Sequence, residues 1–436
     1  MFKKSKILKI GKSFFLIGIF FLASAPVISS ILFLFCLIIS FYLESPNIYK
    51  DKWNYPIFLA IPLMVFITIL QSIFFINIET EIKEKIFLWS PNSSWLGLIN
   101  WIPLFLIYMG FQTFLSNKKD RKICAKFLIA GSIPVLVTGY GQYFFDWYGP
   151  FQTFNSLIIW FQKPLEEGQG LAGLFSNQNY AGCWLNIIWP FSIAYLFDKS
   201  LNISKKSVSI FLMATLSFAI YLTSSRSAWG GLILTLPLLL GKNIFFLISF
   251  SSILVSVLII FNAQILELIS GFRNFIPDQL NFLKEFYPEN YSNFSETRIG
   301  IISFATKMIT KKPFLGWGAG SFSYYNFLET YIYTGHPHNL FLELAFSYGL
   351  LPSVLVFITI IPLCLVSIKY IYLIKKNMSF VDSYYEKAWW TSFVVLLISQ
   401  MIDIQYFDLR VSIAFWILLA GIRSIIRENN INTLNI

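Results

Sequence analysis

Long apolar stretches run along most of the chain and are separated by short polar segments. Most stretches hold about 18 or more residues, enough for an α-helix to cross a hydrocarbon layer about 30 Å thick. The pattern predicts an all-α fold with about twelve transmembrane helices in a single membrane domain, residues 1–436. We place the helices at residues 8–25, 27–43, 54–77, 95–115, 124–142, 178–197, 207–224, 228–241, 243–262, 339–374, 388–404 and 411–426.

Composition supports this interpretation. Of the 436 residues, 56% are hydrophobic and 13% are charged, whereas soluble chains carry roughly 25% charged residues. The mean hydropathy is +0.65. These values exclude a soluble globular protein.

The formal net charge is +11, but the basic residues flank the apolar stretches and do not form a nucleic-acid-binding patch. We therefore expect membrane lipids, and no nucleic acid, as partners. Lys and Arg are enriched on the cytoplasmic side of membrane proteins. Most of them lie on that side if both termini are cytoplasmic, which predicts a multi-pass protein of the bacterial inner (plasma) membrane. The inner segments are then residues 3–12, 50–52, 118–126, 199–206, 242, 369–387 and 423–427.

The N-terminus resembles a secretory signal. It has several lysines, an apolar stretch and the sequence Ala23-Ser24-Ala25, which is typical of a cleavage site. However, Pro26 follows and a second apolar stretch begins at once. We therefore favour an uncleaved helical hairpin.

The cysteines lie singly in or at the edges of apolar stretches, at Cys36, Cys124, Cys183 and Cys364. They form no C-x-x-C pair and have no metal-ligand spacing. We expect them to be small buried hydrophobic residues.

Two predicted outer segments, residues 143–177 and 263–338, are too long for simple connections. Residues 263–338 form a large extracytoplasmic loop rich in aromatic residues, which disordered segments lack. Within it, apolar residues from Ile301 to Ile309 recur at helical spacing and stop before Lys311-Lys312-Pro313. This predicts a short amphipathic helix on the outer face.

The two histidines, His336 and His338, lie where this loop meets the next span. Pro337 suits the first turn of a helix, so we expect His338 and Asn339 in the opening turn. The helix dipole disfavours an imidazolium there, and a neutral imidazole could accept a proton from an attacking hydroxyl. Alternatively, the histidines only anchor the helix end. A metal site is weakly supported, since the sequence shows no third ligand at useful spacing.

Glu343 lies about one turn further along the same helix, on the face of Asn339 and not of His338. We expect it to make a structural hydrogen bond.

Two arginines are candidate anion ligands. Arg226 lies between two apolar stretches on the predicted outer side, where basic residues are scarce, and its guanidinium suits bidentate phosphate binding. Alternatively, it extends only to the lipid headgroups. Arg298 begins the amphipathic helix on its apolar side, and there it either contacts an anionic ligand or pairs with Glu296 or another acid of the loop.

Three further segments carry polar groups of lower specificity. The glycines of Pro313-Phe314-Leu315-Gly316-Trp317-Gly318 permit close backbone approach but match no standard phosphate-binding loop. Asp403, Asp408 and Arg410 predict a local ionic network, and contact with a substrate stays open. The segment from Gly173 to Asn179 could cap the helix that follows it, or bind sugar through its amides.

Together these features resemble the O-antigen ligase and polymerase superfamily over residues 170–410. They are an Arg just outside a span, a second Arg before P-x-x-G-x-G, and His-Asn at the end of the large loop. His338-Asn339 is followed after nine residues by Gly349, which is similar to a pattern of O-antigen ligases. That pattern continues to Gly, Thr or Tyr where this chain has Pro352. Ser225 to Trp229 and Asp403 to Tyr406 also look like segments of this superfamily.

The resemblance implies transfer of a glycan from a polyprenyl pyrophosphate carrier to a hydroxyl of an acceptor glycolipid or glycan, on the extracytoplasmic face. His338 would be the catalytic base, with His336 and Asn339 orienting it. Arg226 and Arg298 would bind the pyrophosphate. No metal ion and no cofactor is expected. The resemblance leaves ligase and polymerase activity open.

Two other functions compete with this hypothesis. A transporter of a small anion such as bicarbonate could use paired arginines, but it should carry ionisable residues or broken helices at mid-membrane. A structural scaffold would not need a histidine pair beside outer arginines.

Overall fold

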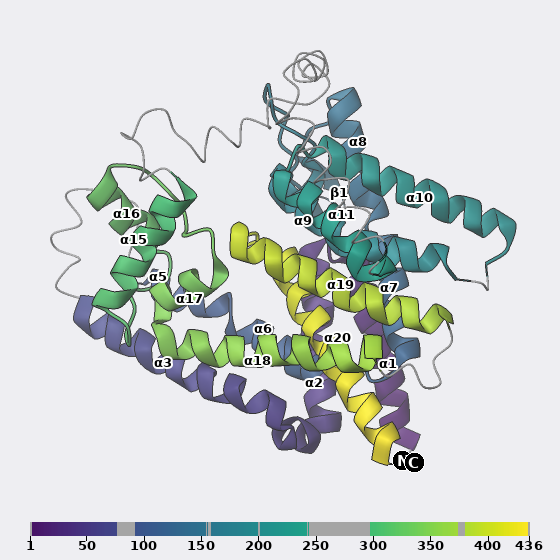
Figure 1. The fold of residues 1–436 in the computed structure, drawn as a ribbon, viewed down its shortest axis with the longest axis horizontal. Helices are drawn as coiled ribbons and strands as arrows, with labels where there is room; N and C mark the ends of the chain where they lie inside the picture. Colours follow the sequence, from purple (N-terminus) through teal and green to yellow (C-terminus); the bar gives the residue numbers. More distant parts are fainter. Residues whose placement is uncertain are drawn as a thin grey trace.

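The computed structural model describes residues 2–75, 92–153, 155, 158–198, 201–241, 243, 297–373 and 380–434. Most of these residues are helical and very few lie in strands, which confirms the all-α class (Figure 1). The N-terminal part contains α1 Phe2–Phe21, α2 Pro26–Lys50, a 3-10 turn η1 Lys52–Asn54, α3 Tyr55–Phe75, α5 Ser93–Ile99, α6 Ile102–Phe111, α7 Lys118–Gly131 and α8 Ile133–Phe145.

The middle of the chain adds a small antiparallel hairpin and three helices. The strands are β1 Phe151–Thr153 and β2 Ile158–Trp160, in which Gln152 pairs with Ile159. A 3-10 turn η2 Gly173–Phe175 follows, and then α9 Gln178–Leu196, α10 Ile203–Leu222 and α11 Arg226–Leu240.

The C-terminal part contains α15 Arg298–Lys311, α16 Phe322–Thr330, α17 Leu340–Tyr348, α18 Leu350–Ile368, a π turn η5 Lys369–Leu373, α19 Phe380–Ile402 and α20 Leu409–Leu434. The helix predicted within the outer loop is present as α15. It packs with α16 and α17 in a separate small group of helices (Figure 1).

Seven helical segments of the described residues are long and apolar enough to cross a membrane. This confirms a polytopic membrane protein, while the number of crossings and the single-domain boundary stay predictions. The span predicted at 243–262 and most of the large loop before residue 297 lie outside the described residues. One hydrophobic core joins helices from α1 to α20, and all four cysteines are free and buried, as expected.

α20 crosses the centre of the helical assembly, and its end lies near the N-terminus (Figure 1). Ion pairs near this end join the segments predicted to lie on the inner side. Lys12 pairs with Asp120, Lys122 with Asp198, and Arg423 with Asp51. These segments therefore share one face of the molecule.

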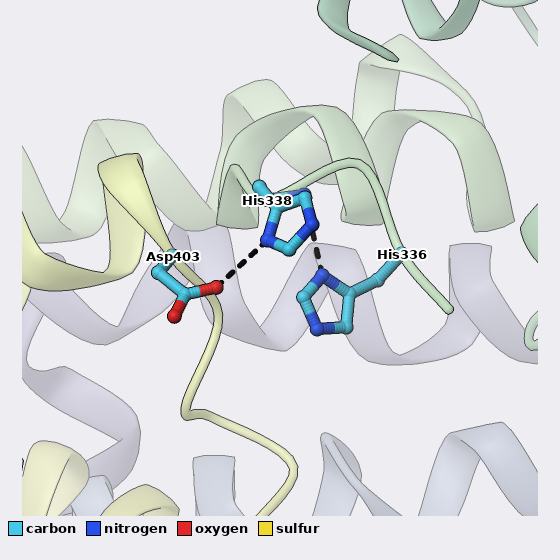
Figure 2. Close-up of side chains that lie close together, drawn as sticks. All are labelled: His336, His338 and Asp403. Atoms are coloured by element: carbon cyan, nitrogen blue, oxygen red, sulfur yellow. Dashed lines mark hydrogen bonds and ion pairs between the residues drawn. The ribbon is translucent and has the colours of Figure 1, made fainter. Parts of the chain in front are cut away.

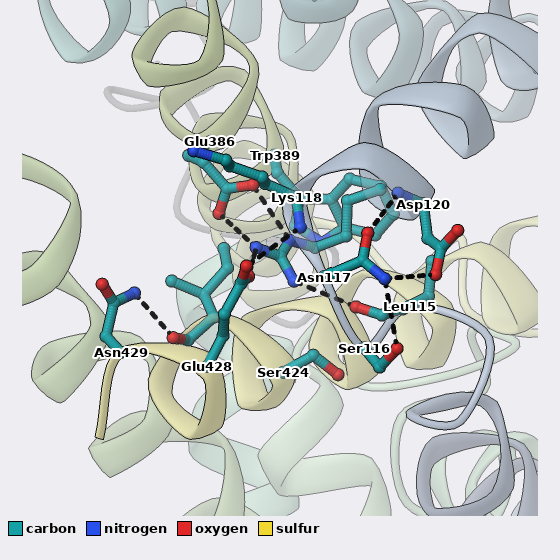
Figure 3. Close-up of polar contacts among 12 residues, drawn as sticks. Leu115, Ser116, Asn117, Lys118, Asp120, Glu386, Trp389, Ser424, Glu428 and Asn429 are labelled. Atoms are coloured by element: carbon teal, nitrogen blue, oxygen red, sulfur yellow. Dashed lines mark hydrogen bonds and ion pairs between the residues drawn. The ribbon is translucent and has the colours of Figure 1, made fainter. Parts of the chain in front are cut away.

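Arg121 of α7 is the centre of the most buried of these contacts. Its Nε lies 2.9 Å from Glu386 Oε1 of α19, and its Nη2 lies 2.6 Å from Glu428 Oε2 of α20. Figure 3 shows the Glu386 and Glu428 carboxylates within one group of polar contacts that also includes Asn117, the N-cap of α7. Three helices are thus joined at one end.

The span predicted as one helix over 339–374 is broken at Gly349. Its φ of +84 favours glycine, and a Cβ there would lie 2.4 Å from the Phe314 carbonyl oxygen. The next amide, of Leu350, donates to Pro313 O at 2.7 Å. The loop after α15 therefore packs against the break between α17 and α18 and is held there against α17.

Candidate functional site

The start of α17 is fixed by Asn339, which is its N-cap. The Asn339 side chain accepts a hydrogen bond from the Leu342 amide at 3.1 Å, and its Nδ2 donates to Met401 O of α19 at 3.0 Å. The expectation that His338 and Asn339 lie in the first helical turn is wrong, because helix geometry begins only at Leu340. His338 precedes the cap with a φ of +54.

His338 makes a close contact with Asp403, which directly follows α19. Its Nδ1 lies 2.7 Å from Asp403 Oδ1, and Figure 2 shows the His338 ring between Asp403 and His336. The other carboxylate oxygen accepts from Gln405 Nε2 at 3.3 Å, and the Gln405 amide donates to Gln400 Oε1 at 2.9 Å. The turn after α19 is therefore held in one conformation that presents Asp403 to His338.

Arg298 approaches the same carboxylate from the outer helix α15. Thr297 caps this helix by accepting from the Gly300 amide at 3.1 Å. Arg298 Nη1 lies 3.5 Å from Asp403 Oδ1 and donates to Ile402 O at 2.9 Å. Its predicted alternative partner Glu296 lies outside the described residues. Half of the Arg298 side chain is still exposed, so this side chain is accessible to a ligand.

His336 lies on the other side of His338. Its Nδ1 accepts from the His338 amide at 3.3 Å, and the two rings are 4.5 Å apart and nearly perpendicular. Burial, and next the neighbouring His338, lower the pKa of His336 to about 4. His336 is therefore neutral at physiological pH.

Asp403 stays ionised in these surroundings. Burial alone would raise its pKa, but the hydrogen bond with His338 and the positive charge of Arg298 together hold that pKa below its ordinary value. An ionised carboxylate only accepts hydrogen bonds, which assigns the proton of neutral His338 to Nδ1. The Nε2 lone pair is then available to accept a proton from a substrate.

A pocket of about 430 Å³ opens beside His336. It lies between α5, the loop after α15 and the start of α17, and its lining includes Asn100, Trp101, Gly320, Glu343 and Phe407. Glu343 accepts from Ser347 Oγ at 3.1 Å, which confirms the expected structural hydrogen bond. Its second oxygen, Oε2, is buried and has no hydrogen-bond partner among the described residues.

The glycine-containing loop packs against α17 and does not offer its amides to a ligand. The amides of Trp317 and Gly318 donate to Phe346 O at 2.7 Å and to Ser347 O at 3.1 Å. Gly316 has a φ of +64, and a Cβ there would lie 2.7 Å from the Gly349 amide nitrogen. Close packing therefore accounts for the glycines.

The predicted ionic network of Asp403, Asp408 and Arg410 is wrong for Asp403, which pairs with His338 and Arg298. Arg410 and Asp408 do form a local pair at 2.5 Å. Arg410 also donates to Leu174 O at 2.8 Å and lies 3.7 Å from the centre of the Phe175 ring. Its role is to hold the segment before α9, where Asn177 caps that helix as expected.

Three acid–base groups, of His336, His338 and Asp403, have donor atoms within 4.8 Å of one another. Two imidazoles and a carboxylate can bind a transition metal, and Asp403 is the third ligand that the sequence did not reveal. However, His338 Nδ1 and Asp403 Oδ1 bind each other, and Arg298 adds positive charge beside the same oxygen. These contacts favour a hydrogen-bonded His–Asp pair over a metal centre.

Arg226 is not among the partners of Asp403. It is exposed at the first position of α11, but short contacts place this end of α11 near the end of α19. A Cβ on Gly182 would meet Ala228 of α11 at 2.7 Å, and Cys183 Sγ lies 3.8 Å from Gln400 Nε2 of α19. The start of α11 and the Asp403 turn therefore lie at the same end of the helices.

A family model described as O-antigen ligase matches residues 211–358. The chain is therefore similar to O-antigen ligases over these residues. The match confirms the resemblance and contains Arg226, Arg298, His336, His338 and Asn339, whereas Asp403 lies beyond it. No curated protein matches the chain. The family indicates a membrane glycosyltransferase of O-antigen ligase or polymerase type, with lipid-linked glycan donors and glycolipid acceptors in general.

Proposed function

We propose that this O-antigen ligase-like protein transfers a glycan from a polyprenyl pyrophosphate to a hydroxyl group of an acceptor glycolipid or glycan. The reaction takes place on the extracytoplasmic face of the bacterial inner membrane and uses neither a metal ion nor a cofactor. The hydrogen bond between His338 and Asp403, beside Arg298, is the observation that carries this proposal.

His338 is the general base in this mechanism. The acceptor hydroxyl gives its proton to His338 Nε2 while its oxygen attacks the anomeric carbon of the donor sugar. Asp403, which touches the other ring nitrogen, orients the imidazole and stabilises it once it carries the proton. Asn339 and His336 hold the backbone around His338 in place.

The bond between the anomeric carbon and the pyrophosphate oxygen breaks as the new bond forms, and the pyrophosphate leaves with the electron pair. Arginine stabilises such charge because its planar guanidinium binds two phosphate oxygens. Arg298 is adjacent to the base and half exposed. Arg226 begins a helix at the same end of the molecule, and we assign it to the distal phosphate.

The pocket beside His336 suits an acceptor sugar. Trp101 and Phe407 supply apolar surface, while the exposed Asn100 supplies a hydrogen-bonding group for a hydroxyl. We therefore place the acceptor on the His336 side of His338, and the donor on the Arg298 side.

Donor binding and transfer should be separated in variants at the two proposed roles. Arg226→Ala should weaken binding of a polyprenyl-pyrophosphate glycan, and Arg226→Lys should restore only part of the activity, because Lys lacks the planar fork. Lys311→Ala, which removes an exposed cation from α15, is the matched control and should be fully active. Full activity of Arg226→Lys would remove the bidentate role, since an arginine that only extends to the headgroups is replaceable by lysine.

The surface glycans of a deletion strain test the reaction class itself. Loss of all glycan-capped lipid would identify a ligase, and loss of long chains alone would identify a polymerase. An unchanged profile would contradict glycan transfer and favour transport of an anion.

A further inference from the structure

A second pocket, of about 350 Å³, lies far from the site described above, at the turn between α2 and α3. It is lined by four cationic side chains, Lys50, Lys52, Arg423 and Arg427, and by the carboxylate of Asp51. Lys50 and Lys52 are exposed, and the two arginines, four residues apart, share one face of α20. One carboxylate cannot balance this charge.

Two acidic groups near this pocket are already paired with arginines. Asp51 accepts from Arg423 Nε at 2.8 Å and from the Trp53 amide at 3.1 Å. Glu428, next to Arg427 in the sequence, pairs with Arg121. The pocket therefore keeps a net positive charge.

Arg423, which lines this pocket, carries an unsatisfied donor. The residue is 8% exposed, and its Nη1 is buried without a hydrogen-bond partner among the described residues. A buried N–H group without an acceptor is unfavourable, and a guanidinium that already binds one carboxylate can still donate to a second anion. This points to an anionic ligand.

The surroundings of the pocket belong to a membrane interface. It lies at the turn between two candidate membrane spans, Pro26–Glu44 and Lys52–Ile73. Tyr49 and Tyr55 on either side of this turn are exposed, and Trp53 lines the pocket. Tyr and Trp are enriched at the level of the lipid headgroups, and basic pockets between transmembrane helices bind anionic headgroups.

We propose that this pocket binds the phosphate group of an anionic phospholipid, at the end of the molecule opposite the glycan-transfer site. Arg423 and Arg427 contact the phosphate, and the two exposed lysines complete its charge balance. A soluble phosphate ester carries the same group, but the position of the pocket at the membrane interface favours a lipid.

Native mass spectrometry of the full-length, delipidated protein tests this assignment, with phosphatidylglycerol as the probe and phosphatidylcholine as the reference. Wild type should retain phosphatidylglycerol preferentially. Because each basic residue near a membrane surface strengthens anionic lipid binding by nearly an order of magnitude, Lys52→Gln with Arg427→Gln should weaken phosphatidylglycerol binding about tenfold or more. Arg427→Lys should keep most of the phosphatidylglycerol binding of wild type.

Lys205→Gln with Lys206→Gln is the matched control, because it removes the same charge from exposed positions of α10. It should bind phosphatidylglycerol as wild type does. The proposal would be overturned if this control lost as much phosphatidylglycerol binding as the pocket variant. It would also be overturned if wild type did not prefer phosphatidylglycerol to phosphatidylcholine. Equally tight binding of glycerol 3-phosphate would overturn the lipid assignment and identify a soluble phosphate ester.

Discussion

The charged groups around Arg121 and around Asp403 both pair an arginine with a carboxylate. The first group is buried, and the second is partly exposed. The Arg121 and Glu386 side chains are only 3% and 4% exposed, and the arginine is held by two carboxylates. Around Asp403, by contrast, the Arg298 side chain is 51% exposed and the His338 side chain 23%. The first group is closed on itself, whereas the second can still contact a ligand.

This difference separates structural charges from reactive ones. A buried ion pair whose hydrogen bonds are complete resists change, because removing one partner leaves an uncompensated charge. Substitution of an arginine that is half exposed beside a histidine and a carboxylate costs less stability. Such an arginine can also bind a substrate anion. We therefore expect variants at Arg121 to affect stability and variants at His338 to affect catalysis.

His338→Ala should have the largest effect on transfer. A general base contributes about 10²–10⁴ in rate, so transfer should nearly stop. Because His338 is partly exposed and lies before the α17 cap, the melting temperature should stay close to that of wild type. Transfer and donor binding measured on the same preparation check this, with binding expected to be intact. A fully active variant would remove the role of His338 as a base.

Glu386→Ala should have the opposite profile. Removing one partner of a buried ion pair costs about 3–5 kcal/mol, and the remaining Glu428 should keep the loss at the lower end of that range. Thermal unfolding in detergent measures it. Glu329→Ala is the control, because Glu329 pairs with Lys307 at an exposed position, where a pair is worth about 0–1 kcal/mol. Similar stability of the two variants would contradict the distinction between the groups.

Asp403→Asn should have a smaller effect than loss of the base itself. Hydrogen bonds to charged groups contribute about 1.5–3 kcal/mol, which corresponds to a loss of about 10- to 100-fold in transfer rate. Transfer rates at saturating donor measure this loss, and thermal unfolding checks that the variant is folded. A variant that transfers as fast as wild type would remove the role of Asp403 in orienting the base.

The histidine pair and Arg298 could be recognised from sequence because they lie on segments with clear local patterns. Asp403 could be recognised as part of a charged segment that resembles the superfamily, but its pairing with His338 could not. Its partner is 65 residues away, and the contact depends on how the end of α19 packs against the start of α17. Apolar periodicity gives the presence of helices but not the register between them, so the His–Asp pair was not predictable.

The break at Gly349 was missed for a related reason. Apolar residues continue on both sides of it, so hydropathy predicts one long helix. A signal was present, since Gly349 followed by Pro352 is typical of one helix ending and the next beginning. Likewise, Pro337 suggested that the helix begins there. The N-cap is instead Asn339, two residues later.

The smallest effect that we predict is that of a chelator, which should leave transfer unchanged. His336, His338 and Asp403 could supply three ligands to a divalent ion, so the absence of an effect is informative. The hydrogen bond of 2.7 Å between His338 and Asp403 already uses two of these atoms, and Arg298 repels a cation from the same carboxylate. Transfer with a lipid-pyrophosphate donor in EDTA, compared with the same preparation in buffer, measures the effect. If EDTA abolished transfer and a divalent ion restored it, the three residues would be metal ligands, and the His338 base and the comparison with the Arg121 group would both need revision.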